Sequence, residues 1–305
     1  MNYTQLDDKK KAQIDVLLEN GYSMRESARM LGISHSTISR YKAGIYQKRK
    51  IDIRKKYSVF IDYFYNHYDR RYCSVDIVIH KFKYEHKIEK CPSVQQVYNW
   101  IKNDKLEIKR SSLCYKRKRA NNRKSGMMQH FEWNLNNRTV LPISLRPKYV
   151  EKRNELGHLE IDSIVGKKNE QASIISIVDR CSRMLWLIKS EYKNEYYTDK
   201  LIYEYILENR ITVKSITVDN GLEFKALGLC AKRLGVKLYK CDPYCSFQRG
   251  TNERTNALVR RWIPKGTSMR NVPQIWLDDI CFQINTMPRK MFDYSTPIGI
   301  DLNYQ

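Results

Sequence analysis

The second half of the chain alternates between strand-like and helix-like segments, and this order restricts the possible folds more than any other feature. Three consecutive segments, 158–165, 172–178 and 184–189, carry β-branched and other apolar residues and predict strands. The segments that follow predict, in order, helix 198–209, strand 215–218, helix 222–234, strand 236–239 and helix 248–262. This order predicts an α/β sheet whose first strands are antiparallel and whose later strands are parallel.

The N-terminal region predicts an all-α helix-turn-helix domain. Ser23 and Glu26 have the spacing of a capping box, and Gly32 suits the turn between two helices. Ser34 is placed to cap a third helix over residues 36–42, whose outward hydroxyl and basic side chains suit base edges and phosphates in a DNA major groove. The predicted DNA-binding residues of this helix are Ser36, Thr37, Arg40 and Lys42. A three-helix bundle without a ligand is the alternative.

Basic residues are concentrated in the first half of the chain. The 305 residues include 56 Lys and Arg against 33 Asp and Glu, a net charge of +23. Residues 1–150 carry 32 basic and 14 acidic side chains, a net charge of +18, whereas residues 151–305 carry a net charge of +5. Clusters of Lys and Arg bind nucleic acid by neutralising phosphates and releasing counterions. The charge therefore predicts a nucleic-acid partner.

The chain is long enough for two or three domains. No acidic residue lies between Glu107 and Glu132, a stretch that predicts either a solvated linker or an arm that follows a DNA backbone. The DNA-binding candidates in this stretch are Lys116, Arg117, Lys118 and Arg119. The predicted parts are a helix-turn-helix domain at 1–48, a second helical unit at 49–108 that is a candidate second helix-turn-helix, a basic linker at 109–150, and an α/β domain with a C-terminal helical tail at 151–305.

Composition also predicts the compartment. No run approaches the ~18–20 apolar residues that a membrane span requires. The first eleven residues are polar and charged, unlike a secretory signal, and the eight cysteines show no disulfide spacing. We therefore expect free thiols in a cytoplasmic protein that associates with the nucleoid of a prokaryotic-type cell and has no membrane partner.

Three acidic residues occupy positions where α/β folds place their sites. Asp162 lies in the first predicted strand, Asp219 ends the fourth, and Glu253 lies in the first turns of the last helix. Carboxylates that converge at one edge of a sheet suit Mg²⁺, and two such ions can activate an attacking oxygen and stabilise a leaving oxygen in phosphodiester chemistry. From the pattern alone, scattered surface or salt-bridged acids are an equal alternative.

The segments around these acids resemble motifs of insertion-sequence-30 family transposases. The three motifs are Gly157-His158-Leu159-Glu160-Ile161-Asp162-Ser163, Val218-Asp219-Asn220-Gly221-Leu222-Glu223-Phe224, and the stretch from Asp242 to Asn256 that contains Gly250-Thr251-Asn252-Glu253-Arg254. The 33 residues between Asp219 and Glu253 match the spacing of that family's Asp-Asp-Glu triad. Leu159 and Val218 stand where the family often has Trp, and neither position is a metal ligand.

The resemblance implies a ribonuclease H-like catalytic domain in which Asp162, Asp219 and Glu253 are the catalytic residues and bind two Mg²⁺ ions, for which Mn²⁺ can substitute. It implies a transposase that binds terminal inverted repeats and catalyses strand cleavage and strand transfer into double-stranded target DNA as a homo-oligomer. Further DNA contacts are expected from Gln248, Arg249 and Arg260. A generic surface arginine is the alternative for Arg260.

Other acids and other functions compete with this interpretation. Glu223 is expected to support the turn after Asp219, and Glu160 is a candidate partner of Asp162 on the same strand face, with His158 on the opposite face. A helix-turn-helix transcriptional regulator with an inactive integrase-like domain is one alternative function. A nuclease that hydrolyses DNA without transferring strands is another.

Overall fold

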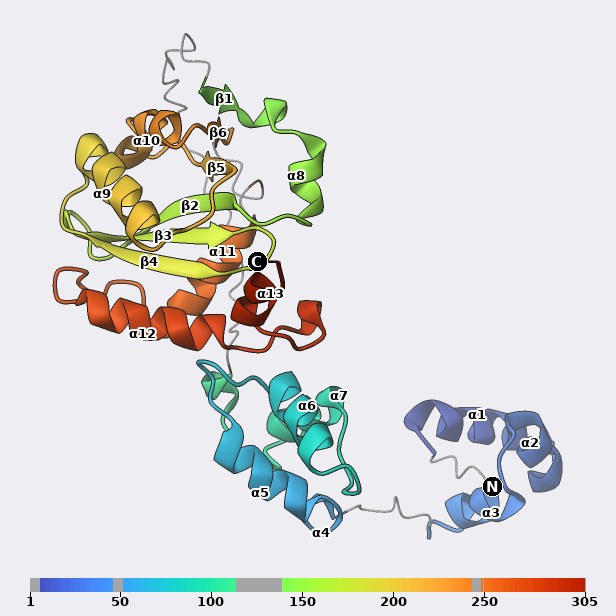
Figure 1. The fold of residues 1–305 in the computed structure, drawn as a ribbon. Coiled ribbons are helices and arrows are strands. Elements are labelled where there is room, and N and C mark those ends of the chain that lie inside the picture. Colours follow the sequence, from blue (N-terminus) through green and yellow to red (C-terminus); the bar gives the residue numbers. More distant parts are fainter. Residues whose placement is uncertain (1–5, 46–51, 114–138, 243–247, 249, 305) are drawn as a thin grey trace. The chain divides into compact units, whose positions relative to one another are not determined.

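A computed structural model describes residues 6–45, 52–113, 139–242, 248 and 250–304. The chain divides into two compact units, residues 1–58 and 59–305. Each unit is described by itself below (Figure 1).

The first unit contains three short helices around a small apolar core. Helices α1 (Asp8–Glu19), α2 (Met24–Leu31) and α3 (His35–Lys42) are followed by the single turn α4 (Ile53–Lys56). The capping box is confirmed, because Ser23 accepts from the backbone of Glu26 and the Glu26 carboxylate accepts from the backbone of Ser23. Gly32 ends α2 with a left-handed φ of 62°. The buried core residues are Leu6, Ile14, Ala28 and Ile38.

The second unit begins with three helices that pack through aromatic residues. These helices are α5 (Ser58–His67), α6 (Val75–Glu85) and α7 (Val94–Lys102), followed by the 3₁₀ turn η1 (Arg110–Ser112). The rings of Phe60 and Phe82 meet edge to face, with centroids 5.1 Å apart. Ser93 and Gln96 form a second capping box at the start of α7.

The rest of the second unit is built on one six-stranded mixed sheet. The strand order is β1-β6-β5-β2-β3-β4. Strands β2, β3 and β4 are antiparallel neighbours, whereas β5 is parallel to β2, and β6 is parallel to β5 and β1. The strands are β1 (Val140–Pro142), β2 (His158–Val165), β3 (Ser173–Asp179), β4 (Leu185–Ser190), β5 (Ser215–Val218) and β6 (Lys237–Lys240). This mixed α/β order, after an N-terminal helical region, confirms the predicted fold class.

Helices cover both faces of the sheet and form two apolar cores (Figure 1). On one face, Ile161 and Ile177 pack with α9 and α10; on the other, Ile164 and Ile174 pack with α11 and α12. The helices of this region are α8 (Lys148–Lys152), α9 (Glu195–Glu208), α10 (Gly228–Arg233), α11 (Gly250–Val259), α12 (Gln274–Asn285) and α13 (Pro297–Tyr304), with 3₁₀ turns η2 (Ile143–Leu145), η3 (Leu222–Phe224) and η5 (Lys290–Phe292). Because side chains alternate along a strand, Glu160 and Asp162 lie on the same face as Ile164, toward α11.

Two local expectations are wrong. The helix predicted over 222–234 is interrupted, because η3 turns the chain so that both Phe224 and Leu227 enter the core before α10 begins. Ser34 occupies the N-cap position of α3, but its hydroxyl is hydrogen-bonded to Ser36 and makes no cap.

The sheet starts earlier in the sequence than expected. Strand β1 pairs with β6 through Val140 and Leu238, within the range that the sequence assigned to the basic linker. Helix α8 begins at the end of this range and carries Glu151, which bonds Arg146 and Arg180. Strand β1 could not be predicted from the sequence, because it has only three residues and polar residues surround it.

The six cysteines in the described part of the chain, Cys73, Cys91, Cys181, Cys230, Cys241 and Cys281, are free thiols. In the same part of the chain, each helix is too short or too polar to cross a membrane.

Candidate active site

The pairing of β2 with β5 places two of the candidate acids side by side. The parallel ladder pairs His158 with Ser215 and Glu160 with Thr217. Continued by two residues, this register brings Asp162 opposite Asp219. Neighbouring strands lie about 4.8 Å apart and in-register residues share a face. The extended register therefore predicts that Asp162 and Asp219, the residue after β5, are neighbours on the face toward α11.

The turn after β5 fixes the Asp219 carboxylate. Its Oδ1 accepts a hydrogen bond of 2.9 Å from the backbone N–H of Gly221, and the Asn220 side chain donates to the carbonyl of Cys241 at 2.7 Å. A Cβ atom on Gly221 would lie 2.9 Å from Glu223 Oε2 and 3.0 Å from Asp219 Oδ1. Gly221 therefore makes room for two carboxylates at this turn, one of them from Glu223.

Helix α11 is hydrogen-bonded to β2 at two points. The backbone N–H of Asn252 donates to Glu160 Oε2 at 3.0 Å, and Asn256 Nδ2 donates to Asp162 Oδ2 at 2.8 Å. Glu253 lies between these two asparagines, in the first turn of the helix, with an exposed side chain. The third candidate acid is thus carried by a helix that bonds directly to the strand of the first.

The donor set fits a hydrated divalent cation. Carboxylates are ligands that Mg²⁺ prefers, and Mg²⁺ usually retains several waters. Three buried oxygens close in sequence to the acids, Ser163 Oγ, Asn220 Oδ1 and Asn256 Oδ1, have no hydrogen-bond partner in the described structure. Within the described ranges, however, no three His, Cys, Asp or Glu side chains form a metal-holding group. The acids lie on three neighbouring elements without converging on one point.

A buried lysine lies next to this group. Lys240 on β6 pairs with Val218, the residue before Asp219, and donates to the carbonyl of Phe224 at 3.3 Å. Burial lowers the pKa of Lys240 to about 7, although the Asp219 carboxylate acts in the opposite direction. Nothing in the sequence pattern indicates a role for this residue, because β6 is short and Lys240 is its last member.

Two of the predicted DNA contacts near the acids are held by local bonds. Arg260 follows α11, and its guanidinium donates to the carbonyl of Val165 at the end of β2 at 2.7 Å. Burial lowers the pKa of Arg260. Gln248 is bonded to Asp242 through both atoms of its amide, at 2.8 and 2.7 Å. Contact of Arg260 and Gln248 with DNA stays a prediction.

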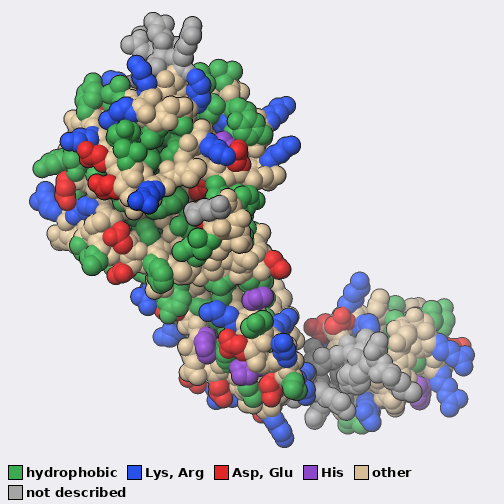
Figure 2. Space-filling view, viewed as in Figure 1, with side chains coloured by type: hydrophobic (Ala, Val, Ile, Leu, Met, Phe, Trp, Pro, Cys, Tyr) green, Lys and Arg blue, Asp and Glu red, His purple; other side chains and the backbone are tan. Residues whose placement is uncertain are grey.

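The predicted contacts of the first unit lie on α3. Ser36, Arg40 and Lys42 are exposed there, whereas Thr37 is half-buried. Lys and Arg side chains are visible on the surface of each part of the chain (Figure 2). The other predicted contacts, Lys116, Arg117, Lys118, Arg119 and Arg249, lie outside the described residues.

One expectation about strand faces is wrong. His158 was expected on the face opposite Glu160, but the two residues are two positions apart on β2 and therefore share a face. His158 is buried, and its Nδ1 lies 2.7 Å from Ser215 Oγ on β5. The sequence analysis also gave no role to Asn256, although its place three residues after Glu253 puts it on the same side of a helix.

Comparison with known proteins agrees with this architecture. A family model described as a helix-turn-helix domain matches residues 2–41. A probable transposase for the insertion-like sequence element IS1161 from Streptococcus salivarius is 29% identical, over 97% of this chain and 93% of its own length. The transposase for insertion sequence element IS4351 from Bacteroides fragilis is 32% identical, over 67% of this chain and 62% of its own. Transposase InsI for insertion sequence element IS30A from Escherichia coli is 37% identical, over 51% of this chain and 40% of its own.

The chain thus spans nearly all of the streptococcal relative and less than two thirds of the other two. Among solved structures, the catalytic core domain of BIV integrase is similar with a TM-score of 0.36 and 19% identity, over 48% of this chain and 98% of that domain.

The chain thus has a helix-turn-helix region followed by a mixed α/β sheet domain. The relatives to which it is similar are transposases of insertion sequence elements, IS30A among them, in agreement with the motifs of its sequence.

Proposed function

We propose that this chain binds the terminal inverted repeats of an insertion sequence, cleaves a strand at the end of the element, and joins the freed 3′-hydroxyl to target DNA. Asp162, Asp219 and Glu253 are the proposed catalytic residues and the ligands of two Mg²⁺ ions, for which Mn²⁺ can substitute. The observation that carries the proposal is the register of β2 with β5, which predicts that Asp162 and Asp219 are neighbours, together with the bonds that hold α11 to β2.

Each acid contributes from a different element. Asp162 lies on β2 and Asp219 directly follows the adjacent strand β5, so we propose that the backbone ladder sets their separation. Glu253 approaches from α11 and its exposed side chain is free to turn toward them. Bound divalent cations would supply activation of the attacking oxygen and stabilisation of the leaving oxygen. Arg260, bonded at the end of β2, is placed to contact a DNA phosphate near the acids.

The N-terminal helices would provide recognition of the inverted repeats. We propose that α3 lies in the major groove, where Ser36, Thr37 and Arg40 contact base edges or phosphates and Lys42 contacts phosphate. The helical unit 49–108 and the basic residues Lys116, Arg117, Lys118 and Arg119 would extend this contact along the duplex, with Gln248 and Arg249 near the cleaved strand. Because two element ends have to be brought together, we propose that the protein acts as a homo-oligomer on DNA.

The test uses the DNA that flanks the gene for this protein. Purified protein is incubated with that DNA in Mg²⁺ or in EDTA, and nicks and joined products are mapped. We expect Mg²⁺-dependent nicks at inverted repeats and joined strands. Asp219→Asn is expected to abolish both while leaving binding to the repeats largely intact, because the helix-turn-helix unit is unchanged.

Asp279→Asn is the matched control. It makes the same chemical change on the exposed surface of α12, and it should keep wild-type cleavage. Full cleavage by Asp219→Asn would refute the assignment of the acids. Repeat binding without nicks in either condition would favour the transcriptional regulator, and nicks without joined strands would favour the nuclease.

A further inference from the structure

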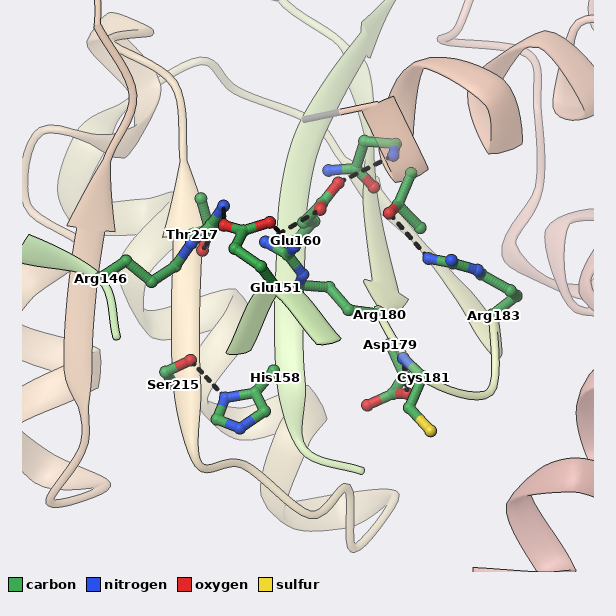
Figure 3. A network of polar contacts seen from close by, with 12 residues as sticks. Arg146, Glu151, His158, Glu160, Asp179, Arg180, Cys181, Arg183, Ser215 and Thr217 are labelled. Atoms are coloured by element: carbon green, nitrogen blue, oxygen red, sulfur yellow. Dashed lines mark hydrogen bonds and ion pairs between the residues drawn. The ribbon is translucent and has the colours of Figure 1, made fainter. Parts of the chain in front are cut away.

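Figure 3 shows a network of charged side chains, buried except for Glu151, which contains none of the candidate acids. It consists of Arg146, Glu151, Glu160 and Arg180, which we call the Arg180 network. Arg180 bonds Glu151 at 2.8 Å and lies 3.5 Å from Glu160 Oε1, and Glu151 also accepts from Arg146. Arg180 and Glu160 have exposed fractions of 1% and 0%, so water does not screen their attraction.

The Arg180 network ends at each of the three elements that carry the acids. Glu160 is two residues before Asp162 on β2. Arg146 donates at 3.0 Å to the hydroxyl of Thr217, which is two residues before Asp219. Glu160 Oε2 accepts from the backbone of Asn252, the residue before Glu253. One set of ion pairs is therefore bonded next to every proposed metal ligand.

The beginning of α11 depends most on these bonds. Strands β2 and β5 are held together by backbone hydrogen bonds, whereas α11 lies against the sheet as a separate element. Near its first turn, the bonds to the sheet domain are the Glu160–Asn252 bond and a 2.8 Å bond from Arg183 to Thr251 Oγ1. A carboxylate makes a stronger hydrogen bond than a neutral acceptor, so the Glu160 side chain is well suited to hold this helix end.

A second ion pair in the same unit, with a buried aspartate and an exposed arginine, joins elements away from the site. Asp199 on α9 bonds Arg233 near the end of α10 and the backbone of Cys230, on the opposite face of the sheet from α11. This pair joins two helices that carry none of the acids. It is therefore a natural comparison for the Arg180 network.

We propose that Glu160 and its partners in the Arg180 network are positioning residues, which hold β2, β5 and the start of α11 in the arrangement that lets Asp162, Asp219 and Glu253 bind metal together. This inference rests on the proposed function of those three acids. The network acts through the backbone next to each acid and does not touch DNA or metal itself.

The test compares Glu160→Gln with Asp199→Asn in the full-length protein. Glu160→Gln keeps the shape of the side chain but removes the ion pair with Arg180 and weakens the acceptor for Asn252. Hydrogen exchange of peptides covering residues 250–256 measures how strongly the start of α11 is protected. Mn²⁺ titration followed by electron paramagnetic resonance measures metal binding. We expect faster exchange in these peptides and Mn²⁺ affinity lower by about 10-fold, the range found when groups that orient metal ligands are removed.

Asp199→Asn separates positioning from stability. It should lower the melting temperature but leave both the exchange of residues 250–256 and the Mn²⁺ affinity at their wild-type values. If Glu160→Gln does not fold, Thr217→Val gives the same test, because it removes only the hydroxyl that Arg146 contacts beside Asp219. Its expected effect is a loss of Mn²⁺ affinity with no change at α11.

Wild-type Mn²⁺ affinity in the folded variant would overturn the inference, as would an equal loss of affinity in Asp199→Asn. The proposed function fails on a different result, which is Mn²⁺ binding or cleavage that persists in Asp219→Asn. Exchange at residues 250–256 is measured without DNA, so the holding of α11 is read independently of any reaction.

Discussion

Helix α12 covers the free edge of the sheet through two amide side chains, and their removal should be costly. Strand β4 is an edge strand, so the backbone groups of alternate residues point away from β3. Asn285 donates to the carbonyl of Leu185 and accepts from its N–H, both at 2.9 Å. Gln274 accepts from Lys189 N–H and donates to the carbonyl of Leu187, both at 2.8 Å.

The expected effect of Asn285→Leu follows from the burial of the partner. Leu185 is fully buried and Asn285 has an exposed fraction of 6%, so water cannot replace the lost bonds. An unsatisfied buried backbone group costs about 1–3 kcal/mol, and two are created, while the added apolar contact recovers ~1 kcal/mol. We expect the free energy of unfolding to fall by about 1–5 kcal/mol. Gln274→Met should cost less, about 1 kcal/mol, because Gln274 is half-buried and water reaches its partners.

Urea denaturation followed by circular dichroism measures both changes, with Asp279→Asn on the exposed side of α12 as the control. The double variant should also aggregate faster, because an uncovered edge strand pairs with other chains. Thioflavin T fluorescence would follow this aggregation. A change of less than roughly 0.5 kcal/mol for Asn285→Leu, which is about the error of such measurements, would show that Asn285 does not stabilise the protein by bonding the backbone of the edge strand.

Three further predictions concern the turn of the first unit, a loop of the second, and DNA binding. Gly32→Val forces a β-branched residue into a left-handed conformation, so it should destabilise the first unit by about 1–2 kcal/mol, measured by thermal melting. The Ser268 hydroxyl and the backbone of Met269 lower the pKa of Glu170 to about 2, so this contribution to stability is complete above the ordinary pKa of 4.5 and is lost as the pH falls toward 2. Glu170→Gln should show a smaller loss of melting temperature over that range. Arg40→Ala should reduce the salt dependence of binding to inverted repeats by about one ion, a slope change of ~0.9.

Each of these predictions has a clear contrary result. An unchanged melting temperature for Gly32→Val would contradict the left-handed turn. Equal acid sensitivity of wild type and Glu170→Gln would show that this carboxylate does not stabilise the loop. An unchanged salt slope for Arg40→Ala would remove this residue from the phosphate contacts.

The sequence predicted the strands that carry the acids because their patterns are strong. Strands β2 and β5 begin and end where the apolar, β-branched runs begin and end, and the turn residues after Asp219 mark the end of β5. The spacing to Glu253 then places the third acid at the start of a helix. The local pattern of apolar residues is sufficient to predict these elements, because each of them has to bury one continuous face.

Other features depend on contacts that a sequence pattern does not contain. Strand β1 has three residues and forms only because β6 offers an unpaired edge. The bond from Asn256 to Asp162 depends on how α11 is rotated against β2. That rotation is set by apolar residues at the C-terminal end of the helix, which pack into the core. Lys240 is buried at the end of a strand that lies between β1 and β5, although its side chain alone predicts exposure.

The positions of the three acids therefore depend on two kinds of contact. The relation of Asp162 to Asp219 is set by a backbone ladder and tolerates changes of neighbouring side chains. The relation of Glu253 to both is set by side chains, chiefly Glu160 and Asn256, because among the described residues no backbone-to-backbone hydrogen bond joins the first turn of α11 to the sheet. Changes near Glu253 should consequently alter metal binding more readily than changes near the strand acids, since a helix held by a few polar bonds can shift while the sheet remains intact.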